Sequence, residues 1–195
     1  MNNLFEGKLI RLRALETDDA ETIFQFNQDS EISRRDARVR WPHSLDGVRR
    51  QLQKTDVSQS GDDKDLAIET LAGQMVGEIN TQLCDGRNGT FSLGIGLGDR
   101  TAWGKGYAKE AILLVLRHMF HERRYQKCNI GVYTFNQRAV DFYRHLGFQD
   151  EGCIRRSYFT NGRYYDEILL GMTVEEFNAN HPDWRITLTE ELRGA

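Results

Sequence analysis

Hydrophobic residues follow two kinds of spacing along this chain, and each spacing predicts one kind of element. Where hydrophobic and polar residues alternate, or a short apolar run lies between turn residues, we expect β-strands. Where hydrophobic residues recur every three or four positions, we expect helices, because that spacing puts them on one face. The predicted strands span residues 9–15, 64–71, 74–84, 90–97, 127–134, 153–160 and 163–172. The predicted helices begin near residues 17, 44, 104 and 136, and the second and third end near 54 and 122.

These elements come in a mixed α/β order: a strand, two helices, three antiparallel strands, a helix, a strand, a helix and a final pair of strands. The final pair flanks Asn161-Gly162, a strong signal for a two-residue hairpin because both residues tolerate positive φ. The stretch 30–43 is polar and predicts a loop between the first two helices.

Length and charge narrow the class of protein. The chain has 195 residues, which suits a single domain over 1–195 with a C-terminal tail from about 173. A formal net charge of −3 makes nucleic acid an unexpected partner. No apolar run is long enough for a membrane-spanning helix. The first residues lack the features of a signal peptide, and three widely spaced cysteines fit reduced thiols. We therefore expect a cytoplasmic protein with neither a metal site nor a membrane partner.

A glycine-rich turn joins the strand 90–97 to the third predicted helix. Glycines at such a turn let consecutive backbone N–H groups point into one small space, and the first N–H groups of a helix have no partner within it. Together with the helix dipole, this arrangement binds phosphate. Two nucleotide motifs are excluded. Gly104 and Gly106 lack the third glycine of G-x-G-x-x-G, and Lys105 is not followed by the Ser or Thr of a Walker loop.

The turn resembles the acyl-CoA loop of the GNAT (Gcn5-related) N-acetyltransferases, whose pattern is Gln/Arg-x-x-Gly-x-Gly/Ala. Its Trp-Gly-Lys-Gly-Tyr run is similar to the branch that acetylates ribosomal-protein N-termini and polyamines, although Trp103 stands where the pattern has Gln or Arg. The resemblance implies that acetyl-CoA is the co-substrate and that backbone amides here hold its pyrophosphate. A loop that only turns the chain is the alternative. The implied cofactor-binding residues are Trp103, Gly104, Lys105, Gly106, Tyr107 and Ala108.

A second motif runs from Asn136 to Phe148. Asn136 suits a helix N-cap and Gly147 a left-handed C-cap. The segment resembles the GNAT pattern Asn-x-x-Ala/Ser-x-x-x-Tyr-x-x-x-Gly-Phe. The resemblance implies that Asn136 contacts the pantetheine or its neighbouring backbone. It also implies that the Tyr143 hydroxyl lies near the CoA sulfur and protonates the leaving thiolate. Capping alone for Asn136 and core packing alone for Tyr143 are the alternatives.

The resemblance extends from Leu9 to about Met172 and carries an expected fold. GNAT domains have a mixed, mostly antiparallel central sheet flanked by helices, here of about seven strands, whose fourth and fifth strands splay apart. The pantetheine lies in that gap and pairs with the fourth strand, which implies cofactor contacts at Ile95, Gly96 and Leu97. The glycines around Ile95 fit a place where a ligand approaches the backbone closely, and an ordinary bulge is the alternative.

An acetyltransferase must place a neutral amine near a thioester, stabilise the developing oxyanion and protonate the thiolate. By resemblance, the backbone N–H of Leu97 is the oxyanion donor and Tyr143 is the catalytic acid. The general base stays open among Glu78, Glu69 and water. A non-catalytic GNAT-like module that senses acyl-CoA is the alternative to an enzyme.

The shared motifs leave the acceptor open. In GNAT proteins the loop between the first two helices and the last hairpin shape the acceptor site. Residues 34–41 hold four arginines and a tryptophan, which would repel a polycation and attract a carboxylate or phosphate. The hairpin offers aromatic and acidic side chains to an amine. A peptide or protein N-terminus or a small amine is therefore favoured over a polyamine. A homodimer, and a ribosomal contact through the arginines, stay open.

Overall fold

The computed structural model describes residues 3–35, 41–58 and 61–184. Within these residues, seven strands form one sheet in the order β1-β2-β3-β4-β5-β7-β6. All neighbouring strands are antiparallel except β4 and β5, which run parallel. The strands are β1 Ile10–Ala14, β2 Lys64–Thr70, β3 Met75–Asp85, β4 Thr90–Leu97, β5 Lys127–Tyr133, β6 Gln149–Thr160 and β7 Arg163–Thr173. The predicted mixed, mostly antiparallel sheet is confirmed.

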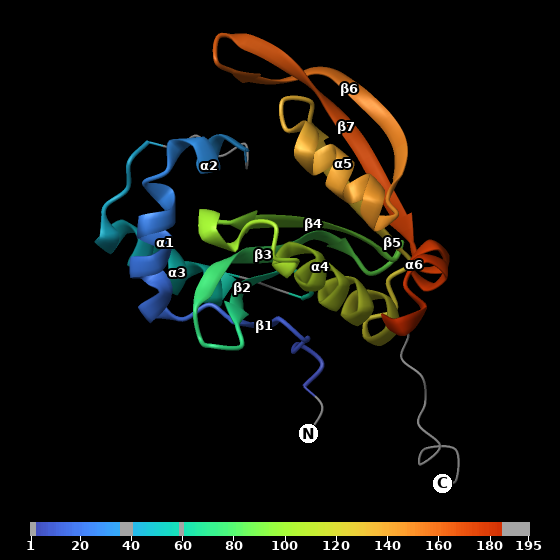
Figure 1. The fold of residues 1–195 in the computed structure, drawn as a ribbon, viewed down its shortest axis with the longest axis horizontal. Helices are drawn as coiled ribbons and strands as arrows, with labels where there is room; N and C mark the ends of the chain where they lie inside the picture. Colours follow the sequence, from blue (N-terminus) through green and yellow to red (C-terminus); the bar gives the residue numbers. More distant parts are fainter. Residues whose placement is uncertain (1–2, 36–40, 59–60, 185–195) are drawn as a thin grey trace, which may run out of the picture.

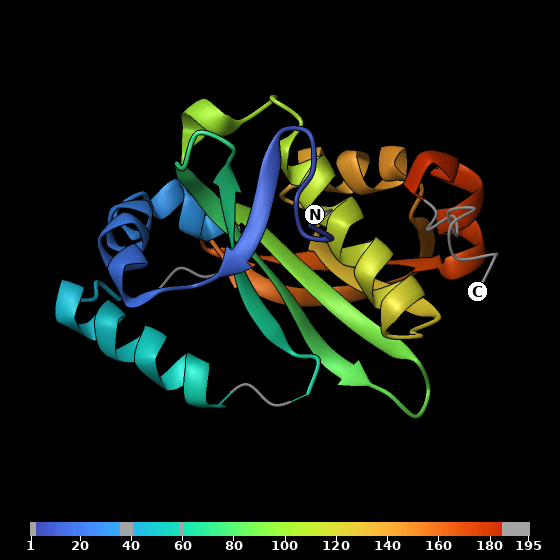
Figure 2. The same cartoon turned by 90° about the horizontal axis from the view of Figure 1, so that it is seen from below.

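Some of the helices gather at one end of the molecule, and others pack along the sheet. α1, α2 and α3 lie together at one end of the molecule, and the β6–β7 hairpin rises from beside α6 at the other end and runs over α5 (Figure 1). α4 contacts β1 and β4, α5 contacts β5, and Figure 2 shows α4 running alongside the long central strands. The helices are α1 Ala20–Asn27, α2 Ser30–Arg35, α3 Leu45–Ser58, α4 Tyr107–Arg117, α5 Gln137–Leu146 and α6 Val174–Asn180. None of these described helices is long and apolar enough to cross a membrane.

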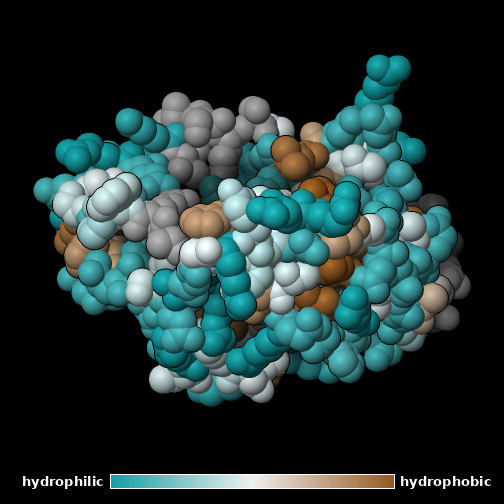
Figure 3. All heavy atoms as spheres, turned by 90° about the horizontal axis from the view of Figure 1, so that it is seen from above, coloured by the Kyte–Doolittle hydropathy of each residue, from teal (hydrophilic) through white to brown (hydrophobic). Residues whose placement is uncertain are grey.

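The main core lies between the sheet and the pair α4 and α5. Phe91 and Leu93 of β4 are buried on this side, in one cluster with Ile112 and Leu116 of α4. Each such side chain contributes about 1.5–3 kcal/mol when it leaves water, so this face holds α4 on the sheet. Side chains alternate along a strand, so residues 92, 94 and 96 of β4 lie on the opposite face. Seen from above, the surface is mostly hydrophilic, with hydrophobic residues gathered near the middle (Figure 3).

The stretch predicted as a loop after α1 begins with a helix instead. Asp29 explains the difference, because its carboxylate accepts the backbone N–H groups of Glu31 and Ile32 at 3.0 and 3.2 Å and caps the start of α2. Ile32 is 7% exposed and anchors one face of the short helix. The predicted loop residues 36–40 lie outside the described residues, and Trp41 is exposed.

Two further differences concern the last third of the chain. β6 begins at Gln149 rather than at 153, because residues of this edge strand are exposed on both faces and show no alternation. After β7, the chain continues as α6, whose start has a capping box between Thr173 and Glu176. Phe177 is fully buried, so the region predicted as a tail from about 173 begins with a helix packed on the core.

Glu110 ties the first strand to the start of α4. Its carboxylate is buried and accepts the backbone N–H groups of Lys8, Leu9 and Ile10 at 2.8, 2.7 and 2.9 Å. Glutamine at this position would turn an NH2 group toward a backbone donor. We expect Glu110→Gln to lower the free energy of unfolding by about 1–3 kcal/mol, the cost of an unsatisfied buried polar group. Urea unfolding followed by circular dichroism measures this, and an unchanged midpoint would contradict the role assigned to Glu110.

Candidate active site

A gap opens in the sheet between β4 and β5. The two strands pair only through Thr90–Ser92 and Lys127–Asn129. Beyond these residues no ladder joins the two described strands, although β4 stays paired with β3, where Gly96 lies opposite Glu78. A strand edge without a partner can pair with an extended ligand. The predicted splaying of the fourth and fifth strands is therefore confirmed.

The turn before α4 has the backbone conformation that its glycines allow. Gly104 has φ +77° and Gly106 φ +87°, a region that costs a residue with a β-carbon roughly 1–2 kcal/mol. Gly106 is the N-cap of α4, and no side chain caps this helix start. The first N–H groups of α4 and the positive end of its dipole are thus left for an anion.

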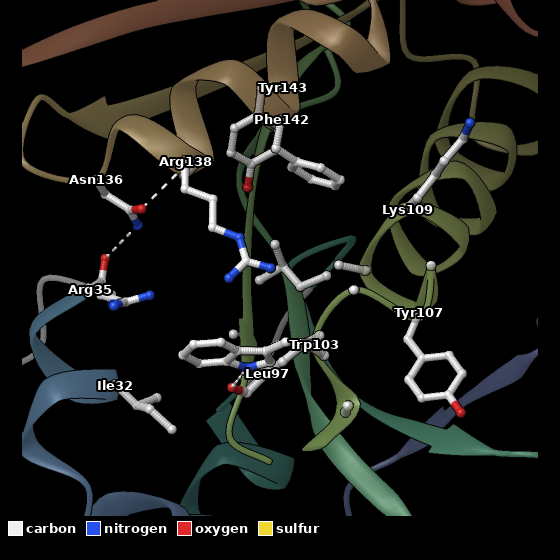
Figure 4. Close-up of a pocket in the computed structure, with 17 residues that line it drawn as sticks. Ile32, Arg35, Leu97, Trp103, Tyr107, Lys109, Asn136, Arg138, Phe142 and Tyr143 are labelled. Carbon is white, nitrogen blue, oxygen red and sulfur yellow. Dashed lines mark hydrogen bonds between the residues drawn. The ribbon is translucent and has the colours of Figure 1, made fainter. Parts of the chain in front are cut away.

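A cavity of about 400 Å³ brings the gap, this turn and α5 together (Figure 4). Every residue predicted to bind the cofactor or to catalyse lines the cavity except Lys105. The predicted residues on its wall are Ile95, Gly96, Leu97, Trp103, Gly104, Gly106, Tyr107, Ala108, Asn136 and Tyr143. Side chains outside the predicted cofactor-binding set complete the wall, among them Ile32, Arg35, Lys109, Arg138 and Phe142. Of these, Arg35 belongs to the arginine-rich stretch 34–41, for which the sequence predicted a role at the acceptor.

The second motif places Asn136 and Tyr143 on the α5 side of this cavity. The Asn136 side chain caps α5 by accepting the N–H of Ala139 at 3.3 Å, and its amide donates to the backbone carbonyl of Arg35, also at 3.3 Å. Tyr143 is 7% exposed. Figure 4 shows its hydroxyl directed into the cavity. Asn136 therefore joins α5 to α2 as well as capping a helix, and Tyr143 combines core packing with a polar group at the site.

Trp103 is the centre of an arginine cluster at the cavity. Its indole N–H donates to the Leu97 carbonyl at 3.1 Å, and the guanidinium carbons of Arg35, Arg138 and Arg100 lie 5.1, 5.4 and 5.6 Å from its ring centroid. Arg100 is ion-paired with Asp29, and hydrogen bonds from Arg100 lower the pKa of that carboxyl to about 2. These arginines come from three separate elements, so no local pattern could have found the cluster.

The wall of this cavity combines a helix N-terminus, an unpaired strand edge and a tyrosine hydroxyl, and the family comparison agrees with that combination. A model of the acetyltransferase (GNAT) domain matches residues 10–149. The chain belongs to the GNAT acetyltransferases.

Relatives of this GNAT protein support the assignment. The SPbeta prophage-derived uncharacterized N-acetyltransferase YokL of Bacillus subtilis (strain 168) is 39% identical over 175 residues, which covers 90% of this chain and 96% of that protein. The spermidine N(1)-acetyltransferase of Escherichia coli (strain K12) is 32% identical over 78 residues, 40% of this chain and 42% of that protein. The crystal structure of spermidine N-acetyltransferase from Vibrio cholerae in complex with CoA and spermine has the same fold. It matches with a TM-score of 0.77 at 23% identity, covering 88% of this chain and 99% of that chain.

Glu69, one of the two carboxylates considered as the general base of this GNAT enzyme, forms ion pairs with two arginines instead. Glu69 is buried between Arg11 and Arg13, whose Nε atoms donate to it at 2.6 Å each. Burial acts to raise the pKa of Glu69, but the hydrogen bonds and charges of the two arginines outweigh it and lower that pKa. A paired carboxylate with a lowered pKa is a poor proton acceptor, and Glu69 is not on the cavity wall. Glu78 lies closer to the site, opposite Gly96.

Cys84 and Cys128 of this N-acetyltransferase are placed where a thiol is a poor nucleophile. No cysteine lines the cavity, and burial, followed by hydrogen bonding to Asp63, raises the pKa of the Cys84 thiol to about 12. Burial also raises the pKa of Cys128. A thiol that stays protonated is a weak nucleophile. Among the described residues, no group of three or more His, Cys, Asp or Glu side chains could hold a metal ion.

Proposed function

We propose that this GNAT enzyme transfers the acetyl group of acetyl-CoA to a primary amine, by direct attack of the amine within a ternary complex. One observation carries the proposal: a single cavity joins an uncapped, glycine-rich helix N-terminus, an unpaired strand edge and the Tyr143 hydroxyl. The three features suit, in order, a pyrophosphate, an extended pantetheine and a leaving thiolate.

Each feature has a task in the transfer. Backbone N–H groups of residues 104–108 hold the pyrophosphate, and Ile95, Gly96 and Leu97 pair with the pantetheine. Asn136 contacts the pantetheine or its neighbouring backbone. The Leu97 N–H stabilises the oxyanion that develops on the thioester carbonyl. Tyr143 protonates the thiolate, a transfer that is slightly uphill because a tyrosine has a pKa of about 10 and a thiol of about 8.5. No covalent enzyme intermediate is needed when the amine attacks directly.

The acceptor is a peptide or protein N-terminus or a small amine, and polyamines belong in the same test. Within the stretch 34–41, Arg35 is a weaker argument against a polycationic acceptor than the sequence suggested. Arg35 is ion-paired with Glu31 at 2.9 Å and lies on the Trp103 ring at the cofactor cavity. The charge of Arg35 therefore lies at the cofactor cavity and is partly neutralised by Glu31, so it gives little reason to exclude a polycationic acceptor.

Two experiments test this function in sequence. Calorimetric titration with acetyl-CoA should show binding in the micromolar range. Thiol release from acetyl-CoA is then followed with an alanyl peptide amide, a lysine-containing N-acetyl peptide, butane-1,4-diamine and spermidine. Steady release with at least one amine supports an enzyme. Tight acetyl-CoA binding without release for any primary amine would favour the sensing module, and no binding at all would overturn the cofactor assignment.

Arg138 is expected to add a charged contact to the phosphates. Its guanidinium reaches into the cavity (Figure 4), and within the described chain it makes no hydrogen bond or ion pair. We expect Arg138→Gln to weaken acetyl-CoA binding about 10-fold, the loss of one charge-assisted contact of about 1.4 kcal/mol. S-acetylpantetheine lacks the phosphates, so its kcat/KM should stay unchanged. Equal losses with both donors would show instead that Arg138 only shapes the cavity.

A further inference from the structure

Glu167 of β7 lies on the open face of the sheet, beside the gap between β4 and β5. Tyr133, the last residue of β5, is paired directly with Glu167, so both side chains lie on the same face. Ile130 and Val132 of β5 are buried in the core cluster and point to the opposite face, toward α5. Tyr133 and Glu167 therefore share the face that does not carry α5.

The carboxylate of Glu167 leans across β5 toward the gap. Gly131 lies on the same face as Tyr133 and has no side chain. The Oε1 atom of Glu167 occupies the place that a β-carbon at residue 131 would take. The other oxygen accepts a hydrogen bond from the Ser157 hydroxyl at 2.7 Å. One carboxylate oxygen is therefore held by β6, while the other lies over β5, the strand that stands between β7 and the gap.

Aromatic rings line the space next to this carboxylate. The rings of Tyr133 and Tyr158 stack with their centroids 4.5 Å apart. The ring centroid of Phe135 lies 5.8 Å from that of Tyr158 and 5.1 Å from that of Tyr165. Burial, then the negative charge of Glu167, raises the pKa of the Tyr133 hydroxyl, so the charge of Glu167 acts on this space. Ring faces and a carboxylate together attract an ammonium group, and the apolar rings reduce competition from water.

The level of Glu167 along the sheet matches the part of β4 that lines the cavity. Ser92 of β4 is paired with Asn129 of β5. Continuing that register by four residues sets Gly96 level with Tyr133, and Tyr133 is paired with Glu167. Gly96 and its neighbours Ile95 and Leu97 line the cavity. The carboxylate itself leans back over Gly131, which the same register sets level with Gly94. An amine bound between the levels of Gly94 and Gly96 would thus approach a thioester held along this part of β4 from the open face, through the gap.

We infer that Glu167 is the catalytic residue that binds the ammonium group of the acceptor and takes its proton before attack. The inference rests on the proposed function and adds the base that it lacks. The ammonium gives one proton to Glu167, which later releases it to solvent. The neutral nitrogen attacks the thioester carbonyl carbon, the C–N bond forms and the C–S bond breaks. The thiolate takes the proton of the Tyr143 hydroxyl. The tyrosinate that is left takes a second proton from the nitrogen, which gives the neutral amide.

The first test compares Glu167→Gln with Glu78→Gln, using the fastest amine of the acceptor panel. We expect Glu167→Gln to lower kcat/KM for the amine about 100-fold, the low end for a general base. Acetyl-CoA binding measured by calorimetry should stay unchanged. The loss should be larger for a lysine-like amine, with a pKa of about 10.4, than for an α-amine near 8, because more of the former must lose a proton.

The second test moves the carboxylate without removing it. Gly131→Ala puts a methyl group where Glu167 Oε1 lies, and Gly171→Ala is the matched control because its methyl group would meet the Glu151 carboxylate instead. We expect Gly131→Ala to lower kcat/KM for the amine by about 10- to 100-fold, in keeping with the cost of small misplacements at an active site. Gly171→Ala should retain the wild-type value. Thermal unfolding of both variants checks that the sheet is intact.

The outcomes separate this inference from the function beneath it. Full activity of Glu167→Gln in an enzyme that acetylates amines overturns the role of Glu167 and leaves the acetyltransferase intact. A loss confined to Glu78→Gln moves the base to β3 and also overturns it. Equal losses in the two alanine variants would assign the effect to the sheet rather than to the carboxylate. A wild-type protein that binds no acetyl-CoA removes the proposed function itself.

Discussion

Replacing Gly106 with tryptophan is expected to abolish acetyl-CoA binding, with a loss of at least about 100-fold, or about 2.7 kcal/mol. Gly106 has φ +87° and is the N-cap of α4. A side chain here is strained in the left-handed region, and a β-carbon would already lie 3.3 Å from Leu9. An indole would also occupy the space in front of the helix N-terminus, where the pyrophosphate is expected. Calorimetric titration with acetyl-CoA measures the loss.

Gly73→Trp is the matched control for this prediction. Gly73 also has φ +87°, but it lies in the turn between β2 and β3, and a β-carbon there would meet nothing within 4 Å. Both variants therefore carry a similar backbone strain of about 1–2 kcal/mol, and only one places its ring in the cavity. Similar midpoints of thermal unfolding with different acetyl-CoA affinities would support the site. Wild-type affinity in Gly106→Trp would mean that this turn does not hold the cofactor.

Tyr143→Phe is expected to lower kcat about 100-fold while acetyl-CoA binding stays unchanged. The phenylalanine ring can keep the contacts of Tyr143 with Phe142 and Phe148, whose centroids lie 5.3 and 5.5 Å away, so the fold should be preserved. What is lost is the hydroxyl directed into the cavity. General acid catalysis contributes about 10²- to 10⁴-fold, and the low end applies because water can also protonate a thiolate. Steady-state thiol release at saturating amine measures kcat.

Tyr125→Phe provides the comparison for Tyr143→Phe. The Tyr125 hydroxyl donates to Asp62 at 3.0 Å, and Tyr125 is not on the cavity wall. Its loss should reduce stability and leave kcat alone. If Tyr143→Phe keeps the wild-type kcat, another group protonates the thiolate and the acid of the mechanism must be reassigned.

Most of the candidate site follows from local signals. The two glycines before α4 need a left-handed backbone, and Asn136 is a helix cap, so both patterns depend on neighbours in the sequence and can be seen there. The order of strands and helices could be predicted for the same reason, because hydrophobic spacing is also a local pattern. The errors came where local signals are weak. α2 depends on one capping aspartate within a polar stretch, and the start of β6 lies on an edge strand without alternation.

Residues brought from distant elements could not be predicted. Arg138 and Arg35 meet on Trp103 only because α5 and α2 close on the same cavity. Glu69 was a candidate base in the sequence, and only the pairing of β1 with β2 reveals the two arginines that neutralise it. In the sequence, Glu167 is one of several acidic residues of a hairpin. Only the strand order, in which β7 lies between β5 and β6, shows that its carboxylate lies over Gly131.

By itself, the sequence determined the family resemblance, the glycine-rich turn proposed to hold the pyrophosphate and the tyrosine proposed as the acid, because these depend on residue types at short, constant spacing. Only the tertiary structure decided which charges face the cavity and which are neutralised. The physical reason is that a charge acts over a few ångströms of space. Residues that the sheet brings this close together can be tens of positions apart in the sequence. Glu110 and Ile10, 100 positions apart, share one hydrogen bond of 2.9 Å for the same reason.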